Sequence, residues 1–283
     1  MRPKGLIAID LDGTLLQEPF YISDSDLEAL EKAASLGYLL ALCTGRSIYT
    51  LLGKLAELRI KDVISIYCGC NGAEYYDIRD AGEVEILGGV TQAAVKEAIG
   101  ILAGVAYGFV WYTEKLIYTT SDNPRLERVK TQMSLPYVFV DKEKISEEFP
   151  KKAAKAVFVL YEKEQYQLKE LLDKHKKGDY DVVFSDPIIL ELIPKGINKG
   201  SAFREICKRN DIDPENTMAI GDHDNDLPML QSSCFGVAMG NAVELLKKEA
   251  NYITGTLEAN GVAEAIEVFL NRQKEKEAKC TKE

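Results

Sequence analysis

Short apolar runs that end in polar turns alternate with amphipathic segments at the start of the chain. Short apolar runs bounded by turn residues indicate buried strands, and apolar residues that recur every three to four positions indicate helices. Strand–helix–strand alternation of this kind predicts a parallel sheet with crossover helices. The expected strands are Leu6–Leu11, Tyr38–Cys43 and Val63–Tyr67, and the expected helices are Ser23–Leu36 and Ser47–Leu58.

The pattern changes from about Ala73 to Leu192, where the expected strands are rich in Tyr, Phe and Thr and carry more charge. We interpret this stretch as a separate α+β module inserted between two halves of the first domain. Its expected strands are Val105–Tyr112, Leu116–Thr119, Tyr137–Val140, Ala156–Tyr161 and Val182–Phe184, and its expected helices are Gln92–Leu102, Pro124–Met133 and Glu164–His175.

The alternating pattern then resumes, with the charged tail Asn271–Glu283 expected to fray. The pattern along the whole chain predicts an α/β fold. Residues 1–80 and 190–283 are expected to form a Rossmann-like, doubly wound parallel core, and residues 81–189 are expected to form the insert. The joining segments are expected near Asp77–Gly82 and Asp186–Ile189. The late elements are expected at Lys199–Arg209, Thr217–Ile220, Leu227–Gln231, Cys234–Met239, Ala242–Glu249, Tyr252–Thr254 and Val262–Leu270.

Charge and composition narrow the possible partners. The 283 residues carry a net charge of −10 without a basic block, which argues against nucleic acid and against an anionic membrane surface. No stretch approaches the ~20 apolar residues of a membrane helix. The six cysteines show no Cys-x-x-Cys pair, so reduced cysteines in a cytoplasmic protein are expected. Any anionic substrate must therefore be bound by local positive charge.

Four short polar segments lie where an expected strand ends or an expected helix begins. In open parallel sheets such ends form the ligand site. Crowded carboxylates repel one another unless a cation lies among them, and oxygen-only ligands suit Mg²⁺. Lys199, the hydroxyl of Thr44 and backbone N–H groups add the donors that a phosphoryl group needs. The clustered segments are Asp10-Leu-Asp12-Gly-Thr14, Thr44-Gly45-Arg46, Asn198-Lys199-Gly200 and Gly221-Asp222-His-Asp-Asn225-Asp226.

These four segments resemble, in order, the four motifs of the haloacid dehalogenase superfamily. Pro194–Gly200, Gly236–Ala242 and Gly261–Ile266 look like its Cof-type branch, subclass IIB. The resemblance implies a Mg²⁺-dependent phosphatase acting on small phosphorylated metabolites such as sugar phosphates. It also implies that the insert, between the second and third motifs, is a substrate-specificity cap of the C2B type.

The resemblance implies roles residue by residue. Asp10 would be the nucleophile, forming an aspartyl phosphate, and Asp12 the general acid and base. The metal would be held by Asp10, by the backbone carbonyl of Asp12 and by Asp222, with Asp226 behind them. The phosphoryl group would be bound by Thr44, Gly45, Lys199 and Asn225, and the entrance would be lined by Arg46, Asn71 and Gly72.

Two alternatives stay open at this stage. Phosphomannomutases share this core and cap type and transfer the phosphoryl group within a sugar. A non-catalytic protein that binds a phosphorylated metabolite is the other alternative, although such scaffolds usually lose the nucleophile or the acid. His223 is not expected to bind the metal, since hard cations seldom use imidazole. The sequence leaves the substrate and the oligomeric state open.

Overall fold

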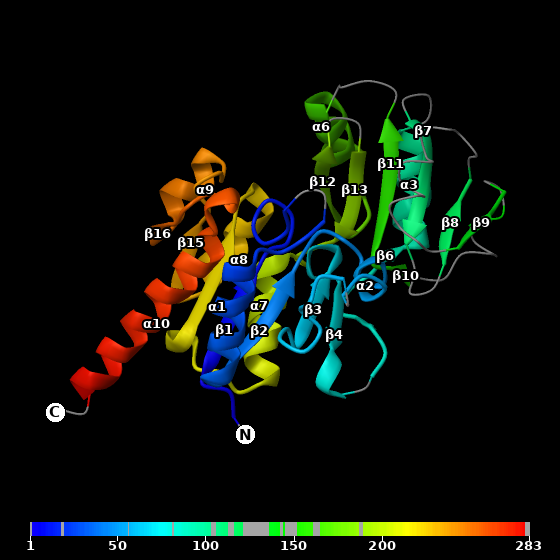
Figure 1. Cartoon of the computed structure of the whole chain (residues 1–283). Coiled ribbons are helices and arrows are strands. Elements are labelled where there is room, and N and C mark those ends of the chain that lie inside the picture. The colour runs from blue at the N-terminus through cyan, green and yellow to red at the C-terminus, as the bar shows by residue number, and fades with distance from the viewer. Residues whose placement is uncertain are drawn as a thin grey trace.

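The computed structural model describes residues 2–17, 20–55, 57–80, 82–102, 106–112, 116–120, 136–141, 144, 152–160, 165–186 and 189–280. The fold is built on two sheets, which Figure 1 shows as separate bodies joined at the β3–β4 end of the first. No helix among the described residues is long and apolar enough to cross a membrane.

The first sheet has the strand order β16-β15-β14-β1-β2-β3-β4-β5. All pairs from β16 to β3 are parallel, and β4 and β5 add antiparallel strands at one edge. Strands β1, β2 and β14 are buried along their whole length, as expected where helices cover both faces. The bounds are β1 Gly5–Ile9, β2 Tyr38–Cys43, β3 Ile66–Gly69, β4 Glu74–Asp77, β5 Glu85–Ile86, β14 Thr217–Gly221, β15 Phe235–Ala238 and β16 Tyr252–Ile253.

The helices of this part are α1 Asp24–Ser35, α2 Ile48–Leu52, α7 Lys199–Arg209, α8 Leu227–Ser232, α9 Glu244–Glu249 and α10 Gly261–Cys280. The α/β class predicted from the alternating pattern is confirmed. Two local expectations are wrong. The described part of the tail, up to Cys280, continues α10 instead of fraying, and the helix after Ser47 ends at Leu52.

The second sheet has the order β12-β13-β11-β7-β8-β9, and β6 pairs with β10 beside it. Helices α3 and α6 pack on one face, where they enclose a core with Phe158, Trp111 and Leu192. The predicted helix Pro124–Met133 lies outside the described residues. The bounds are β6 Val90–Thr91, α3 Gln92–Ile101, β7 Ala106–Tyr112, β8 Ile117–Thr119, β9 Tyr137–Phe139, β10 Lys152–Ala153, β11 Lys155–Leu160, α6 Gln165–His175, β12 Tyr180–Asp186 and β13 Ile189–Pro194.

The strand pairing places the two junctions later in the chain than the pattern suggested. β5 still pairs with β4 in the first sheet up to Ile86, whereas β13 belongs to the second sheet up to Pro194. β13 was not among the expected strands, because Ile189–Pro194 begins within the expected joining segment. The division into a catalytic core and a specificity cap remains a proposal.

Candidate active site

Lys199 lies at the centre of the polar cluster. Its Nζ is 2.5 Å from Asp10 Oδ1 and 2.6 Å from Asp226 Oδ1, and its side chain is 1% exposed. Asp10 is held at the end of β1 by its N–H, which donates to Ile220 O on the neighbouring strand β14. Lys199 opens α7, whose first turn is capped by Asn198. Strand ends and a helix start therefore bring together residues that are distant in the sequence.

Asp226 serves as the support of this cluster. While Oδ1 contacts Lys199, Oδ2 accepts hydrogen bonds from the N–H groups of Asp222 and His223, both at 3.0 Å. Both carboxylate oxygens are therefore occupied by protein donors. The role behind the metal ligands that the motif resemblance implied for Asp226 stays a prediction.

Asp222 directly follows β14 and is held by the turn after β1. Its Oδ1 accepts a hydrogen bond of 2.9 Å from Thr14 Oγ1. Gly13 adopts a φ of +81°, and a Cβ there would lie 2.5 Å from Asp222 Oδ2, so glycine lets the backbone approach this carboxylate. Carboxylate oxygens of Asp10, Asp222 and Asp226 lie within 4.8 Å of one another.

The charge balance of the cluster favours a bound cation. Burial and the nearby Asp226 raise the pKa of Asp10 well above its ordinary value, against the opposing effect of Lys199. Burial likewise raises the pKa of Asp222, although Thr14 opposes this. Burial would lower the pKa of Lys199, but Asp10 and Asp226 together raise it. One lysine thus serves several carboxylates, and the oxygen-only donors fit a hard divalent cation such as Mg²⁺.

Asp12 pairs with Arg46 rather than with Lys199. Arg46 Nε donates to Asp12 Oδ2 at 2.8 Å and Nη2 donates to Oδ1 at 2.5 Å, which forms a two-pronged ion pair. The Arg46 guanidinium also lies 5.7 Å from the ring centre of Phe20. Arg46 was expected at the entrance of the site, and its pairing with Asp12 was not predicted. The pairing could have been inferred, because Asp12 and Arg46 follow β1 and β2, which are adjacent parallel strands.

The remaining predicted residues are linked to one another around Asn71 and Gly72. Asn225 Nδ2 donates to Asn71 Oδ1 at 3.0 Å, and the Asn71 N–H donates to Thr44 O at 3.0 Å. Gly45 lies against Asn71, since a Cβ on Gly45 would be 3.5 Å from Asn71 Oδ1. Gly72, with a φ of +100°, leaves room for Asn198 O, which a Cβ would approach to 2.6 Å. Asn71 therefore links the two motifs: its side chain contacts Asn225 of the fourth motif, and its N–H contacts Thr44 of the second.

Asn241 also supports the site, although it was expected only as part of the Gly236–Ala242 family motif. Asn241 Nδ2 donates to Gly13 O at 2.8 Å, and its Oδ1 accepts from Leu257 N at 2.9 Å. Asn241 therefore ties the turn after β1 to the turn before α10. Its position shortly after β15, another parallel strand of the sheet, could have indicated this role.

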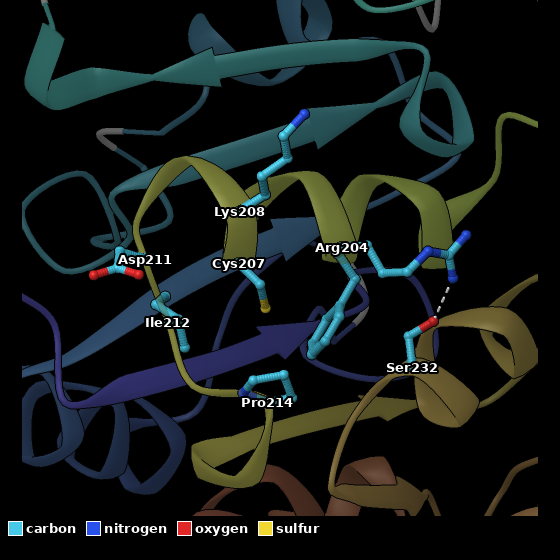
Figure 2. A pocket seen from close by; sticks show the side chains of 8 residues that line it. Arg204, Cys207, Lys208, Asp211, Ile212, Pro214 and Ser232 are labelled. Atoms are coloured by element: carbon cyan, nitrogen blue, oxygen red, sulfur yellow. Dashed lines mark hydrogen bonds between the residues drawn. The ribbon is translucent and has the colours of Figure 1, made fainter.

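A cavity of about 420 Å³ lies elsewhere, along the second half of α7 (Figure 2). Figure 2 shows Arg204, whose Nη1 donates to Ser232 Oγ, on one side and Pro214 on the other. Pro214 precedes β14, so this cavity lies towards the amino end of that strand. The motif residues follow the carboxyl ends of the strands, so this cavity is separate from the candidate active site.

Comparison with known proteins identifies the family. A profile of haloacid dehalogenase-like hydrolases matches residues 7–266. The chain belongs to this family. A Streptococcus pyogenes protein named as a phosphatase is 30% identical over 92% of the chain and 96% of its own length. A Bacillus subtilis 5-amino-6-(5-phospho-D-ribitylamino)uracil phosphatase is 27% identical, covering 92% and 94%.

The solved structures agree with this assignment. The chain is similar to a sugar phosphatase of haloacid dehalogenase subclass IIB, with a TM-score of 0.77 and 27% identity over 94% of the chain and 98% of that protein. The resemblance to subclass IIB inferred from the motifs is confirmed.

Proposed function

We propose that the chain hydrolyses phosphomonoesters of small metabolites through an aspartyl phosphate on Asp10. The observation that carries this proposal is the buried contact of Lys199 Nζ with both Asp10 and Asp226, next to the carboxylate of Asp222. This arrangement combines an ionisable nucleophile with a fixed positive charge for the phosphoryl oxygens. We expect Thr44, Gly45 and Asn225 to add donors to the same oxygens.

Mg²⁺ held by Asp10, Asp222 and the carbonyl of Asp12 would supply further positive charge to the transferring phosphoryl group. In the first step an Asp10 oxygen bonds to phosphorus while the bond to the leaving oxygen breaks. Protonated Asp12 gives its proton to that oxygen. In the second step the Asp12 carboxylate takes a proton from water as the water oxygen bonds to phosphorus. The bond between phosphorus and Asp10 then breaks, and phosphate is released.

The pairing of Asp12 with Arg46 adds a condition to this mechanism. A guanidinium fork binds the ionised carboxylate, so Asp12 must leave Arg46 before it can act as an acid. Because the Asp12 side chain is 49% exposed in the ion pair, it has room to turn. We propose that seating of the insert over the substrate accompanies this turn and excludes water from the first step.

The substrate class is proposed from the relatives. One is named a sugar phosphatase and another acts, by its name, on a phosphorylated ribityl chain, so both names describe a phosphate on a polyhydroxylated carbon chain. We propose a substrate of this kind, in the cytoplasm, with neither nucleic acid nor a membrane as a partner.

The test is phosphate release from a panel of phosphorylated sugars, polyols and cofactors, with and without Mg²⁺, for the wild type and Asp10→Asn. An amide cannot replace the carboxylate as nucleophile, so we expect a loss of at least about 10³-fold in kcat with an unchanged circular dichroism spectrum. Asp24→Asn, a surface carboxylate paired with Arg59, is the matched control and should keep full activity.

Three other outcomes would decide against the proposal. Substantial turnover by Asp10→Asn would exclude Asp10 as the nucleophile. Product formation that requires a sugar bisphosphate activator would indicate a mutase. Silence of folded wild-type protein across the panel, together with measurable ligand binding, would indicate a metabolite-binding protein.

A further inference from the structure

A buried lysine of the second sheet contacts the backbone of the first. Lys155, the first residue of β11, is 3% exposed, and its Nζ donates to Gly45 O at 3.1 Å. The same Nζ lies 2.9 Å from Glu191 Oε1 on the neighbouring strand β13. Neither Lys155 nor Glu191 contacts the substrate in the mechanism proposed above. The two parts of the protein thus meet at the loop that carries Thr44.

The register of the second sheet fixes which way this pair faces. Val157 pairs with Glu191, so Lys155 lies diagonally opposite Glu191 on the same face of the sheet. The alternate residues Ala156, Phe158 and Leu192 face the helices α3 and α6. Lys155 and Glu191 therefore lie on the face opposite the helices.

The hydrogen bond from Lys155 to Gly45 O adds to two backbone hydrogen bonds that hold the Thr44–Gly45–Arg46 loop. Thr44 O accepts from Asn71 N at 3.0 Å, and Arg46 O accepts from Cys70 N at 2.8 Å. Both of those donors are backbone groups of the first part of the chain. The middle carbonyl, that of Gly45, accepts from a side chain of the second sheet. The geometry of this loop therefore depends on the position of β11.

A second buried carboxylate, that of Glu74, holds the residues that directly follow the loop. Glu74 on β4 accepts hydrogen bonds from Ser47 Oγ at 3.0 Å and from Ile48 N at 2.6 Å, at the start of α2. Burial would lower the pKa of Lys155, but Glu191, Cys70 and Glu74 raise it overall. A charged Lys155 thus balances the carboxylates on both sides of the junction.

We propose that the Lys155–Glu191 pair positions the Thr44–Gly45–Arg46 loop according to the seating of the insert. When β11 is in place, Lys155 fixes Gly45 O, and this holds the neighbouring Thr44 for the phosphoryl group. When β11 moves away, the loop loses this support. Lys155 and Glu191 are positioning residues, and the kinetic part of the inference rests on the proposed phosphatase function.

The test uses the full-length double variant Lys155→Met/Glu191→Met. Replacing both partners of a buried ion pair by apolar residues of similar volume usually preserves the fold, whereas removing one partner leaves a buried charge. Leu192→Ala is the control, because it weakens the same sheet from the face that packs on the helices. If the double variant does not fold, Lys155→Gln/Glu191→Gln removes both charges and is measured in its place.

The first measurement is amide hydrogen exchange of peptides that cover residues 44–48 and 69–72. We expect roughly tenfold or faster exchange there in the double variant, and no such local change in Leu192→Ala. The second measurement is kinetic. We expect kcat/KM for the best substrate, and inhibition by inorganic phosphate, to weaken by about 10–100-fold in the double variant, with little change in the control.

The outcomes separate this inference from the proposed function. Unchanged exchange in both peptides of the folded double variant would overturn the positioning role, whatever the activity. Equal kinetic losses in the double variant and in Leu192→Ala would overturn it as well, since they would indicate a general weakening of the sheet. A wild type without phosphatase activity would refute the proposed function, while the exchange measurement would still test the support of the loop.

Discussion

At the scale of single residues, the positive charge of Lys199 balances the negative charges of Asp10 and Asp226. Lys199→Met removes the cation between Asp10 and Asp226 and leaves two buried carboxylates without it. Breaking a buried ion pair from one side costs about 3–5 kcal/mol, so we expect a large loss of stability and of activity. The measurements are urea unfolding and phosphate release.

Lys195→Met is the matched control for this prediction. Lys195 lies 3.3 Å from Asp179 in an ion pair whose side chains are 65% and 85% exposed. Exposed pairs contribute little, so the change in unfolding free energy should stay within about 1 kcal/mol. A Lys199→Met protein as stable and active as this control would show that Asp10 and Asp226 do not depend on Lys199.

Residue types and spacing predicted which side chains would gather, but not how each would pair. The sequence named Asp10, Asp12, Lys199 and Asp226, and the structure brings all four to one edge of the sheet. The bidentate pair of Asp12 with Arg46 depends on the register of β1 against β2. Strand register of this kind is set by packing across the sheet and not by the spacing of either motif.

At the scale of elements, the start of α7 places Lys199. Asn198 accepts from Ser201 N at 2.9 Å, and Ser201 Oγ accepts from Asn198 N at 3.0 Å, so each caps the other. Asn198→Ala should cost about 1 kcal/mol of stability and also lower kcat, since the first turn that presents Lys199 loosens. Thermal unfolding and steady-state kinetics measure the two effects.

Thr91→Ala offers a matched control at the start of α3. Thr91 Oγ1 accepts from Ala94 N at 3.2 Å, which is the same kind of cap but on a helix that carries none of the proposed site residues. We expect a similar loss of stability with kcat unchanged. If both variants lose stability but keep the wild-type kcat, the cap of α7 serves the fold and not the placement of Lys199.

Element boundaries followed the hydrophobic pattern where helices cover a sheet on both sides. β1, β2, β14 and α7 lie within a few residues of their expected ranges. β13 was missed because it follows a stretch interpreted as a joining segment, although Glu191 on it pairs with buried Lys155. Pairing across the second sheet decides this strand, and its partners are distant in the sequence.

At the scale of the whole molecule, the acidic cluster should couple cation binding to stability. Mg²⁺ that binds the folded chain alone at ~100 times its Kd would stabilise it by about 2.7 kcal/mol. We therefore expect Tm to rise by roughly 5 °C or more in Mg²⁺ and to fall again with a chelator. Asp222→Asn should abolish most of this rise. Asp224→Asn, an exposed neighbour in the same loop, should keep it.

The size of this Mg²⁺ effect should depend on pH. Burial raises the pKa of Asp10 and of Asp222, so the folded protein holds protons on them more tightly than the unfolded chain does. Without Mg²⁺, their contribution to stability therefore falls as pH rises above about 4. With Mg²⁺, the ionised carboxylates bind the cation, so the contribution rises with pH. The difference between the two Tm values should widen from pH 5 to pH 8. A difference that stays constant over this range would show that Mg²⁺ stabilises the protein without ionisation of these two carboxyls.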